Sequence, residues 1–300
     1  MRGALVAMAV LAACACAPTS GTAASTSGTA VSETVKLETS FTPDRLGAST
    51  TIGFGFQIAG PHGEAPPPLT HVDLQLPAGI DYVTTTMGLA VCQPAVLLAQ
   101  GPPGCSPNSR IGSGSATVEV PFGTGGGQEL PSIEAFMGPS DNGNLVVVFY
   151  ADGRTPVAAD VIFEGELVPG FGSSSGSLNN AIPLIPSVPG GSDVSIISVH
   201  TTIGPGNLRY YKRVHGKRVS FAPKGVSLPA TCPRGGFPFT ADFSFLDGTS
   251  ATATSTVPCP PRRRIRSRAS TAPTWRATAH AFAHKTPRSP PSQMQLPPPP

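Results

Sequence analysis

The chain has 300 residues, of which 39% are hydrophobic, 12% are charged, 34 are glycine and 35 are proline. This length accommodates one large domain or two smaller ones, and the abundance of turn-forming residues excludes a mainly helical protein or a coiled coil. The net charge of +3 conceals two regimes, because eight of the 20 basic residues and none of the 17 acidic residues follow Cys259. The rest of the chain therefore has 12 basic against 17 acidic residues, a charge of −5.

The first residues have the layout of an export signal. Arg2 precedes a short apolar run that is too short to span a bilayer as a mature helix. The run ends in Leu11-Ala12-Ala13-Cys14, which resembles a bacterial lipobox and predicts a signal over residues 1–17 with lipidation at Cys14.

Cleavage by an ordinary signal peptidase, up to about residue 24, is the alternative. Cysteine parity bears on this choice, because lipidation at Cys14 leaves Cys16 as an odd thiol, whereas cleavage beyond Cys16 leaves an even set. In either case residues 18–34, rich in Ser, Thr, Gly and Ala, are expected to form a flexible linker.

Alternating apolar residues predict strands throughout residues 35–260. The segments are 35–42, 50–58, 71–76, 116–120, 133–137, 157–167 and 193–202. Residues 145–150 are apolar without a break, which predicts a central strand covered on both faces. Hairpin turns are predicted at Asn142-Gly143, at His215-Gly216 and at Asp247-Gly248.

The fold class that follows is all-β. We expect an antiparallel β-sandwich, either one large unit or two packed sub-domains, with a disordered N-terminal linker and C-terminal tail. Residues 170–189 are rich in Gly, Ser, Asn and Pro, so a sub-domain boundary is expected there if one exists.

Residues 261–300 form a basic, proline-rich segment that cannot build a core, so we expect a solvated tail. It favours no specific nucleic-acid partner. The abrupt change after Cys259 also resembles GC-rich DNA read in the wrong frame, a hypothesis that a comparison of the three reading frames tests. His280 and His284 have helical spacing but lack a third ligand, so no metal site is predicted there.

Four cysteines lie in the body, and they form two pairs. Cys92 and Cys105 bracket a short loop, and Cys232 and Cys259 bracket the last predicted hairpin. In an oxidising compartment each pair predicts a disulfide that stabilises the fold by about 2–4 kcal/mol. The alternative, a zinc site, lacks C-x-x-C spacing and suitably placed histidines, so no metal or other cofactor is predicted.

Two groups of residues suggest hydrolytic chemistry. Ser174 lies in a G-x-S-x-G match followed by Asp193 and His200, but no buried strand precedes it and no helix follows it. Asp160, Glu164 and Glu166 share one face of a predicted strand and suit calcium binding or glycoside hydrolysis. The competing interpretation is the solvent face of a half-buried strand with Val161 and Phe163 inside.

A basic, aromatic hairpin is the candidate binding surface. Its residues are Tyr210, Tyr211, Lys212 and Arg213. They suit contact with a polyanionic wall polymer or with sugar rings, while an ordinary charged hairpin with its aromatic residues in the sheet is the alternative. His71 and Asp73 share a strand face and are expected to be structural, because no acid–base partner is identified.

Short motifs are spread over residues 37–260. They include Phe41-Thr42-Pro43, Leu76-Pro77-Ala78-Gly79-Ile80, Gly88-Leu89-Ala90-Val91-Cys92, Gly104-Cys105-Ser106-Pro107-Asn108-Ser109 and Cys232-Pro233-Arg234-Gly235-Gly236-Phe237. In these motifs the chain resembles a family of uncharacterised exported proteins of actinobacteria. The resemblance implies export, a β-rich fold and the two cysteine pairs, and it carries over no catalytic residue.

These observations favour an extracytoplasmic protein, membrane-anchored or secreted, with a non-enzymatic binding or structural role. The expected partner is a cell-wall polymer or another surface protein. The rival interpretation is an envelope or secreted hydrolase that uses the carboxylates of residues 160–166, for which a cleft with converging polar groups is required.

Overall fold

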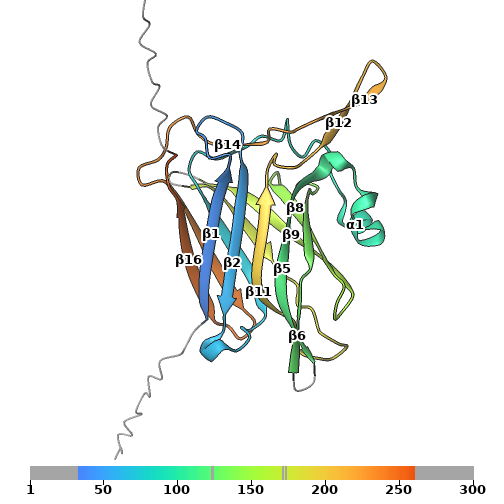
Figure 1. The fold of residues 1–300 in the computed structure, drawn as a ribbon, viewed down its shortest axis with the longest axis vertical. Helices are drawn as coiled ribbons and strands as arrows, with labels where there is room; N and C mark the ends of the chain where they lie inside the picture. Colours follow the sequence, from blue (N-terminus) through green and yellow to red (C-terminus); the bar gives the residue numbers. More distant parts are fainter. Residues whose placement is uncertain (1–32, 123–124, 171, 173, 261–300) are drawn as a thin grey trace, which may run out of the picture. The chain divides into compact units, whose positions relative to one another are not determined.

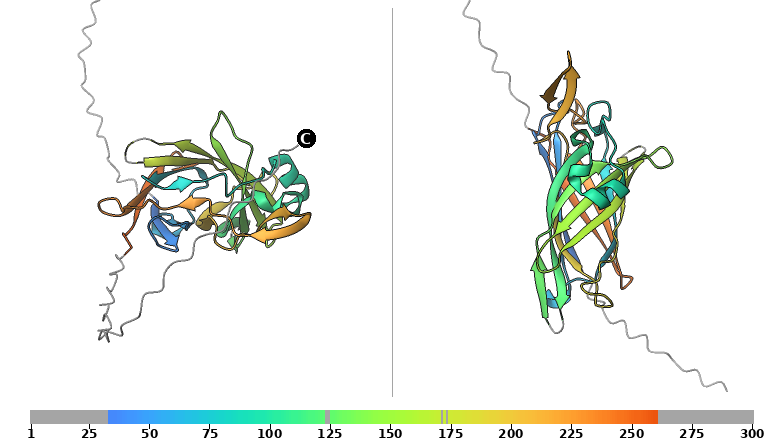
Figure 2. Two further views of the ribbon diagram at one scale, coloured as in Figure 1. Left: turned by 90° about the horizontal axis from the view of Figure 1, so that it is seen from above. Right: turned by 90° about the vertical axis from the view of Figure 1, so that its right-hand side faces the viewer.

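The computed structural model describes residues 33–122, 125–170, 172 and 174–260 (Figures 1 and 2). The strands of the large sheet are β1 (Thr34–Thr42), β2 (Thr51–Ala59), β3 (Leu69–Pro77), β5 (Arg110–Phe122), β6 (Gly125–Glu129), β7 (Ser132–Met137), β8 (Leu145–Gly153), β9 (Ala159–Pro169), β10 (Ser174–Ala181), β11 (Ser195–Ile203), β15 (Phe237–Phe245) and β16 (Ser250–Val257). Two short ladders pair β4 (Asp81–Tyr82) with β14 (Val226–Ser227), and β12 (Tyr210–Val214) with β13 (Lys217–Phe221). The one α-helix of the described ranges is α1 (Pro94–Gln100), and 3₁₀ turns span Pro61–Gly63, Pro102–Gly104 and Pro107–Ser109.

The large sheet follows the order β1-β2-β11-β5-β7-β8-β9-β10-β3-β15-β16, with β6 paired to β5, and its pairings are antiparallel. It curls until β1 and β16 lie side by side (Figure 1). Thr39 Oγ1 donates to Ser255 Oγ at 2.9 Å, and Thr249 Oγ1 donates to Glu33 Oε2 at 2.9 Å. Both pairs have the same separation of 216 residues, so the two edge strands run parallel.

The predicted all-β, antiparallel fold class is confirmed. In place of the two separate sheets of a sandwich, the structure has one nearly closed, barrel-like sheet, whose opposite walls form the two layers. Asn142 (φ 47°) with Gly143 (φ 87°), His215 (φ 48°) with Gly216 (φ 76°), and Gly248 (φ 85°) adopt the left-handed conformations that tight turns require. The three predicted hairpins are therefore also confirmed.

Strand β8 is covered on both faces, as its unbroken apolar sequence predicts. Val147 and Phe149 belong to the interior core, whereas Val148 and Tyr150 pack with Leu97 of α1. The right-hand view of Figure 2 shows α1 against the outside of this wall. The helix has seven residues, beginning at Pro94, which is too short for the sequence to display a helical apolar period.

The Gly/Ser-rich stretch 170–189 contains β10, which pairs with β9 on one side and β3 on the other. The sequence predicts a sub-domain boundary in this stretch if one exists. The structure instead has a strand of the large sheet there. Its sequence, SSGSLNNA, has Leu178 as its single large apolar residue, so alternation gives no strand signal.

Both predicted disulfides are confirmed. Cys92 and Cys105 have Cα atoms 5.3 Å apart, and those of Cys232 and Cys259 are 5.9 Å apart. Both bridges lie at the end of the sheet where β1 finishes and β5 and β15 begin, which we call the disulfide end. They indicate an oxidising, extracytoplasmic environment. No helix within the described residues is long and apolar enough to cross a membrane.

The interior is packed asymmetrically. One side is filled by phenylalanines, with the Phe41 and Phe237 ring centroids 5.2 Å apart and those of Phe56 and Phe243 5.1 Å apart. Phe237, Phe239 and Phe243 are 0–1% exposed. The opposite side of the interior, inside the walls formed by β5, β7, β8, β9, β10 and β11, is hollow. The candidate site lies in this hollow.

Candidate ligand-binding cavity

A cavity of about 300 Å³ lies inside the large sheet. Its walls come from β2, β3, β5, β7, β8, β9, β10 and β11, whose alternate side chains point inward. Representative lining residues are Phe54, Val161, Phe163, Leu178 and Val199. The volume lies at the lower end of the range of about 300–1,000 Å³ that is typical of small-molecule sites.

Several apolar side chains that line this cavity face inward but are incompletely buried, whereas others, such as Phe56 and Ile133, are 4% exposed. Phe54, Phe163, Leu178 and Val199 are half-buried, although each packs on the central core. Protein interiors are normally close-packed, so inward-facing residues in a filled core lose nearly all their accessible surface. The exposed apolar surface therefore faces the cavity, where a ligand can cover it.

The disulfide end of the cavity is closed by tightly packed loops. Met87, Tyr210, Val226 and Leu228 are 0–3% exposed there. Two disulfides hold the same region. This end therefore offers little room for a ligand to pass.

The other end, which we call the crossing-loop end, is covered by two connections that cross between strands far apart in the sheet. Residues 182–194 join β10 to β11, and residues 60–68 join β2 to β3 (Figure 1). Ser195 Oγ, at the first residue of β11, donates to the Pro66 carbonyl oxygen at 2.6 Å and so links the 60–68 connection to the start of β11. Leu184 lines the cavity and is also 42% exposed, so the apolar lining reaches solvent at this end.

Few polar groups face the cavity, and three carry atoms that find no hydrogen-bond partner among the described residues. These atoms are the Tyr82 hydroxyl, Ser175 Oγ and Asn180 Oδ1. Burial raises the pKa of Tyr82, which keeps its hydroxyl neutral and able to donate. Ser175 is in the β-bulge between Ser174 and Gly176 of β10. The sequence patterns marked none of these three as cavity residues. The G-x-S-x-G match that contains Ser175 pointed to Ser174 instead, and Tyr82 and Asn180 lie in no recognised motif.

The candidate hairpin is only partly a surface feature. Tyr210 is 0% exposed, its hydroxyl donates to the Arg110 carbonyl oxygen at 2.8 Å, and it accepts from the Gly88 amide at 3.0 Å. Tyr210 is therefore a core residue, which corrects its place in the binding surface. A short alternating segment between basic residues does not reveal which aromatic side chain fills the core.

The rest of the hairpin is accessible. The Arg218 guanidinium lies 3.7 Å from the centroid of the Tyr211 ring, and Lys212 Nζ lies 5.5 Å from that of Phe221. Lys212 and Arg213 are exposed. Contact of Tyr211, Lys212 and Arg213 with a wall polymer stays a prediction.

Replacing Tyr210 with phenylalanine is expected to lower the free energy of unfolding by about 1–3 kcal/mol, because it leaves the Gly88 amide and the Arg110 carbonyl without their partner. Urea unfolding followed by circular dichroism measures the change. Tyr211→Phe is the control, since it keeps the ring under Arg218 and should change stability by less than about 0.5 kcal/mol. Equal effects of the two substitutions would contradict a structural role specific to Tyr210.

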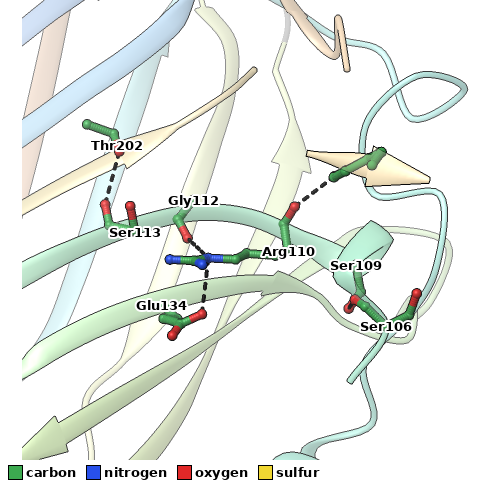
Figure 3. A network of polar contacts seen from close by, with 8 residues as sticks. Ser106, Ser109, Arg110, Gly112, Ser113, Glu134 and Thr202 are labelled. Atoms are coloured by element: carbon green, nitrogen blue, oxygen red, sulfur yellow. Dashed lines mark hydrogen bonds and ion pairs between the residues drawn. The ribbon is translucent and has the colours of Figure 1, made fainter. Parts of the chain in front are cut away.

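The polar network near this hairpin lies on the outside of the wall and is satisfied locally (Figure 3). Arg110 Nε is 3.0 Å from Glu134 Oε2 across β5 and β7, and Thr202 Oγ1 donates to the Ser113 carbonyl oxygen at 3.0 Å. These groups hold neighbouring strands together and do not converge on a hollow.

The carboxylates of β9 also lie on the outer face. Asp160 is 3.5 Å from Arg154 Nη2, and Glu166 accepts from Asn144 Nδ2 at 2.7 Å. Val161 and Phe163 of the same strand line the cavity, so the half-buried strand interpretation is confirmed. The converging carboxylates that the hydrolase interpretation needs are not formed inside the cavity.

The G-x-S-x-G serine is likewise engaged by the backbone. Ser174 Oγ donates to the Leu76 carbonyl oxygen at 2.9 Å and accepts from the Gly176 amide at 3.1 Å. His200 is exposed on β11, five positions away from β10 in the sheet order. Ser174 and His200 are therefore not brought together as a nucleophile and its base.

Asp73 faces Asp242 directly across the outer face of β3 and β15. Burial, together with the negative charge of Asp242, raises the pKa of Asp73 above its ordinary value of 3.8. Between the ordinary and the raised pKa the folded chain holds more protons than the unfolded chain. Stability therefore falls as pH rises through this interval and stays lowered at neutral pH.

Asp73→Asn is expected to raise the free energy of unfolding at pH 7, because it removes the like-charge pair while keeping the side-chain shape. The gain should lie near the lower end of about 0.2–1 kcal/mol, since solvent screens a partly exposed pair. Urea unfolding at pH 7 and pH 3 tests this, and the gain should vanish at pH 3. A gain of equal size at both pH values would exclude ionisation as the cause.

Within the described ranges, no three His, Cys, Asp or Glu side chains are grouped to hold a metal ion. Cys14 and residues 261–300 lie outside the described residues. No protein-family model, curated protein or solved structure matches the chain.

Proposed function

We propose that this chain is a non-enzymatic, extracytoplasmic binding protein that encloses one small, largely apolar molecule within its barrel-like sheet. The observation that carries the proposal is the set of inward-facing but half-buried side chains around the cavity, among them Phe54, Phe163 and Val199. Covering apolar surface contributes about 25 cal/mol per Å², so the lining provides a driving force for binding.

The dimensions of the cavity limit the ligand. A volume of about 300 Å³ corresponds to roughly ten water molecules at liquid density. One hydrocarbon chain of medium length or a small ring system fits this volume, whereas a lipid with several long chains does not. The lining strands supply fixed walls, so binding requires little ordering of the protein.

We also propose that the chain is exported by its N-terminal segment, and that it belongs to the actinobacterial family it resembles. The two disulfides support an extracytoplasmic location. Intact mass spectrometry of membrane and medium fractions tests the route. A lipid-sized increment on Cys14 supports an anchored protein, and a lipid-free species that starts after Cys16 supports a secreted one. A full-length species starting at Met1 in both fractions would contradict export by signal cleavage.

Fluorescence titration with N-phenyl-1-naphthylamine, an apolar dye, tests the binding proposal. The full chain is first extracted with organic solvent while folded on a column, and its fold is checked by circular dichroism. The proposal predicts saturable enhancement of the dye's fluorescence at one dye per chain, together with release of a small apolar molecule into the extract. Non-saturable dye fluorescence with a correctly folded chain would contradict it.

A further inference from the structure

Asn180 is a polar residue at an inward-facing position of the cavity wall. It is 7% exposed and lies on β10 opposite Gly165 of β9. The neighbouring odd-numbered residues of β9, Phe163 and Leu167, line the cavity, so a side chain at residue 165 would point inward too. A Cβ atom built on Gly165 would overlap Asn180 Oδ1. The amide of Asn180 therefore occupies the interior space that the glycine leaves.

The orientation of this amide is determined by its hydrogen bonds. Asn180 Nδ2 donates to the Val72 carbonyl oxygen at 3.2 Å and to the Leu178 carbonyl oxygen at 3.0 Å. Carbonyl oxygens accept and cannot donate, so the nitrogen must face them and Oδ1 must face away. Across the part of the chain that the structure describes, Oδ1 has no donor.

An acceptor without a donor in an apolar site costs about 1–3 kcal/mol. A ligand with an O–H or N–H group at this point recovers that free energy, whereas a ligand with only acceptors or only hydrocarbon does not. Among the described residues the cavity lining contains one buried carboxylate, Glu129, and no lysine or arginine, so an ionised carboxylate or phosphate would be buried without a counter-charge.

We infer that the cavity selects an amphiphile without a negative charge, with a hydrocarbon part and a hydroxyl or N–H group that donates to Asn180 Oδ1. This inference rests on the proposed binding function and specifies its ligand class. Gly165 and the two backbone carbonyls position the acceptor, and the apolar walls hold the hydrocarbon part.

Displacement of N-phenyl-1-naphthylamine by two isomers tests the inference. 1-Decanol and 1-methoxynonane have the same formula, but only the alcohol can donate a hydrogen bond. For the wild-type chain we expect half-displacement by the alcohol at about a 3- to 10-fold lower concentration than by the ether. Decanoate at pH 8 should displace the dye least, because its carboxylate cannot donate and would also be buried without a counter-charge.

Variants separate the Asn180 acceptor from other causes of alcohol preference. Asn180→Leu should bring the ratio between the isomers to about 1 without weakening ether binding. Asn179→Leu, on the adjacent outward-facing residue, should keep the wild-type ratio. For each protein we take the ratio of the half-displacement concentrations of the two isomers. Comparing this ratio between variants cancels the difference in water solubility between the isomers. Gly165→Ala, which pushes the amide from its place, should also abolish the preference and serves if Asn180→Leu does not fold.

Three results would overturn the inference. Equal displacement by the two isomers from the wild-type chain would mean that water satisfies Oδ1 or that the ligand group lies elsewhere. A preference that survives both Asn180→Leu and Gly165→Ala would assign the donor contact to another group, such as Ser175 or Tyr82. Stronger displacement by decanoate than by decanol would contradict selection against a negative charge. Failure of the wild-type chain to bind the dye at all would instead defeat the proposed function.

Discussion

Val199→Trp is expected to weaken binding of N-phenyl-1-naphthylamine by about 10-fold or more, because the indole occupies the space that the ligand needs. Val199 lines the cavity from β11. In a filled core such an enlargement costs about 1–3 kcal/mol of stability. In this chain the added rings extend into the cavity, so we expect the free energy of unfolding to change by less than 1 kcal/mol.

His200→Trp is the matched control for this prediction. His200 follows Val199 directly and is exposed on the outer face of the same strand. The same substitution there should leave dye affinity within about two-fold of wild type, since surface changes are usually small. Dye titration and urea unfolding are measured on both variants. Undiminished dye binding by Val199→Trp would place the dye outside the sheet, and a large loss of stability would indicate a filled interior.

Phe243→Ala is expected to lower the free energy of unfolding by about 3–5 kcal/mol, the cost typical of removing a fully packed phenylalanine. Phe243 is 1% exposed and its ring centroid is 5.1 Å from that of Phe56. Phe163→Ala should cost less, about 2–3 kcal/mol, because Phe163 is incompletely buried and already faces the cavity. Phe163 stacks on Phe149 at 4.9 Å, and it also lines the cavity.

The same substitution, phenylalanine to alanine, is made on the filled side of the interior and on the cavity side, so the side-chain atoms removed are identical. Urea unfolding monitored by far-UV circular dichroism gives both free energies. Phe163→Ala should also change dye affinity, whereas Phe243→Ala should not do so while the chain is folded. Equal losses of stability at the two positions would contradict the asymmetric packing.

Much of the fold follows from local sequence patterns. Alternation locates most strands of the large sheet, and Asn142-Gly143 and His215-Gly216 have the conformational freedom that tight turns need. The disulfides follow from compartment and spacing. Strand β10 could not be found in this way, because its strand pairing rests on backbone hydrogen bonds to β3 and β9 and not on an apolar pattern.

The cavity is harder to predict than the strands around it. Alternation shows that Phe54, Phe163 and Val199 face inward, but it does not show whether side chains from opposite walls meet. That depends on the curvature of the whole sheet and on the parallel approach of β1 and β16. Asn180 gives no signal either, since an asparagine in a Gly/Ser-rich stretch is typical of a loop.

Whether the barrel-like sheet encloses a ligand is tested by a crystal structure of the chain grown with 10-bromo-1-decanol, with diffraction data collected at the bromine absorption edge. We expect one anomalous peak inside the sheet, among the side chains of β2, β9 and β11, and a hydroxyl within hydrogen-bond distance of Asn180 Oδ1. An interior closed by contacts between opposite walls, with bromine only at the outer surface, would contradict it.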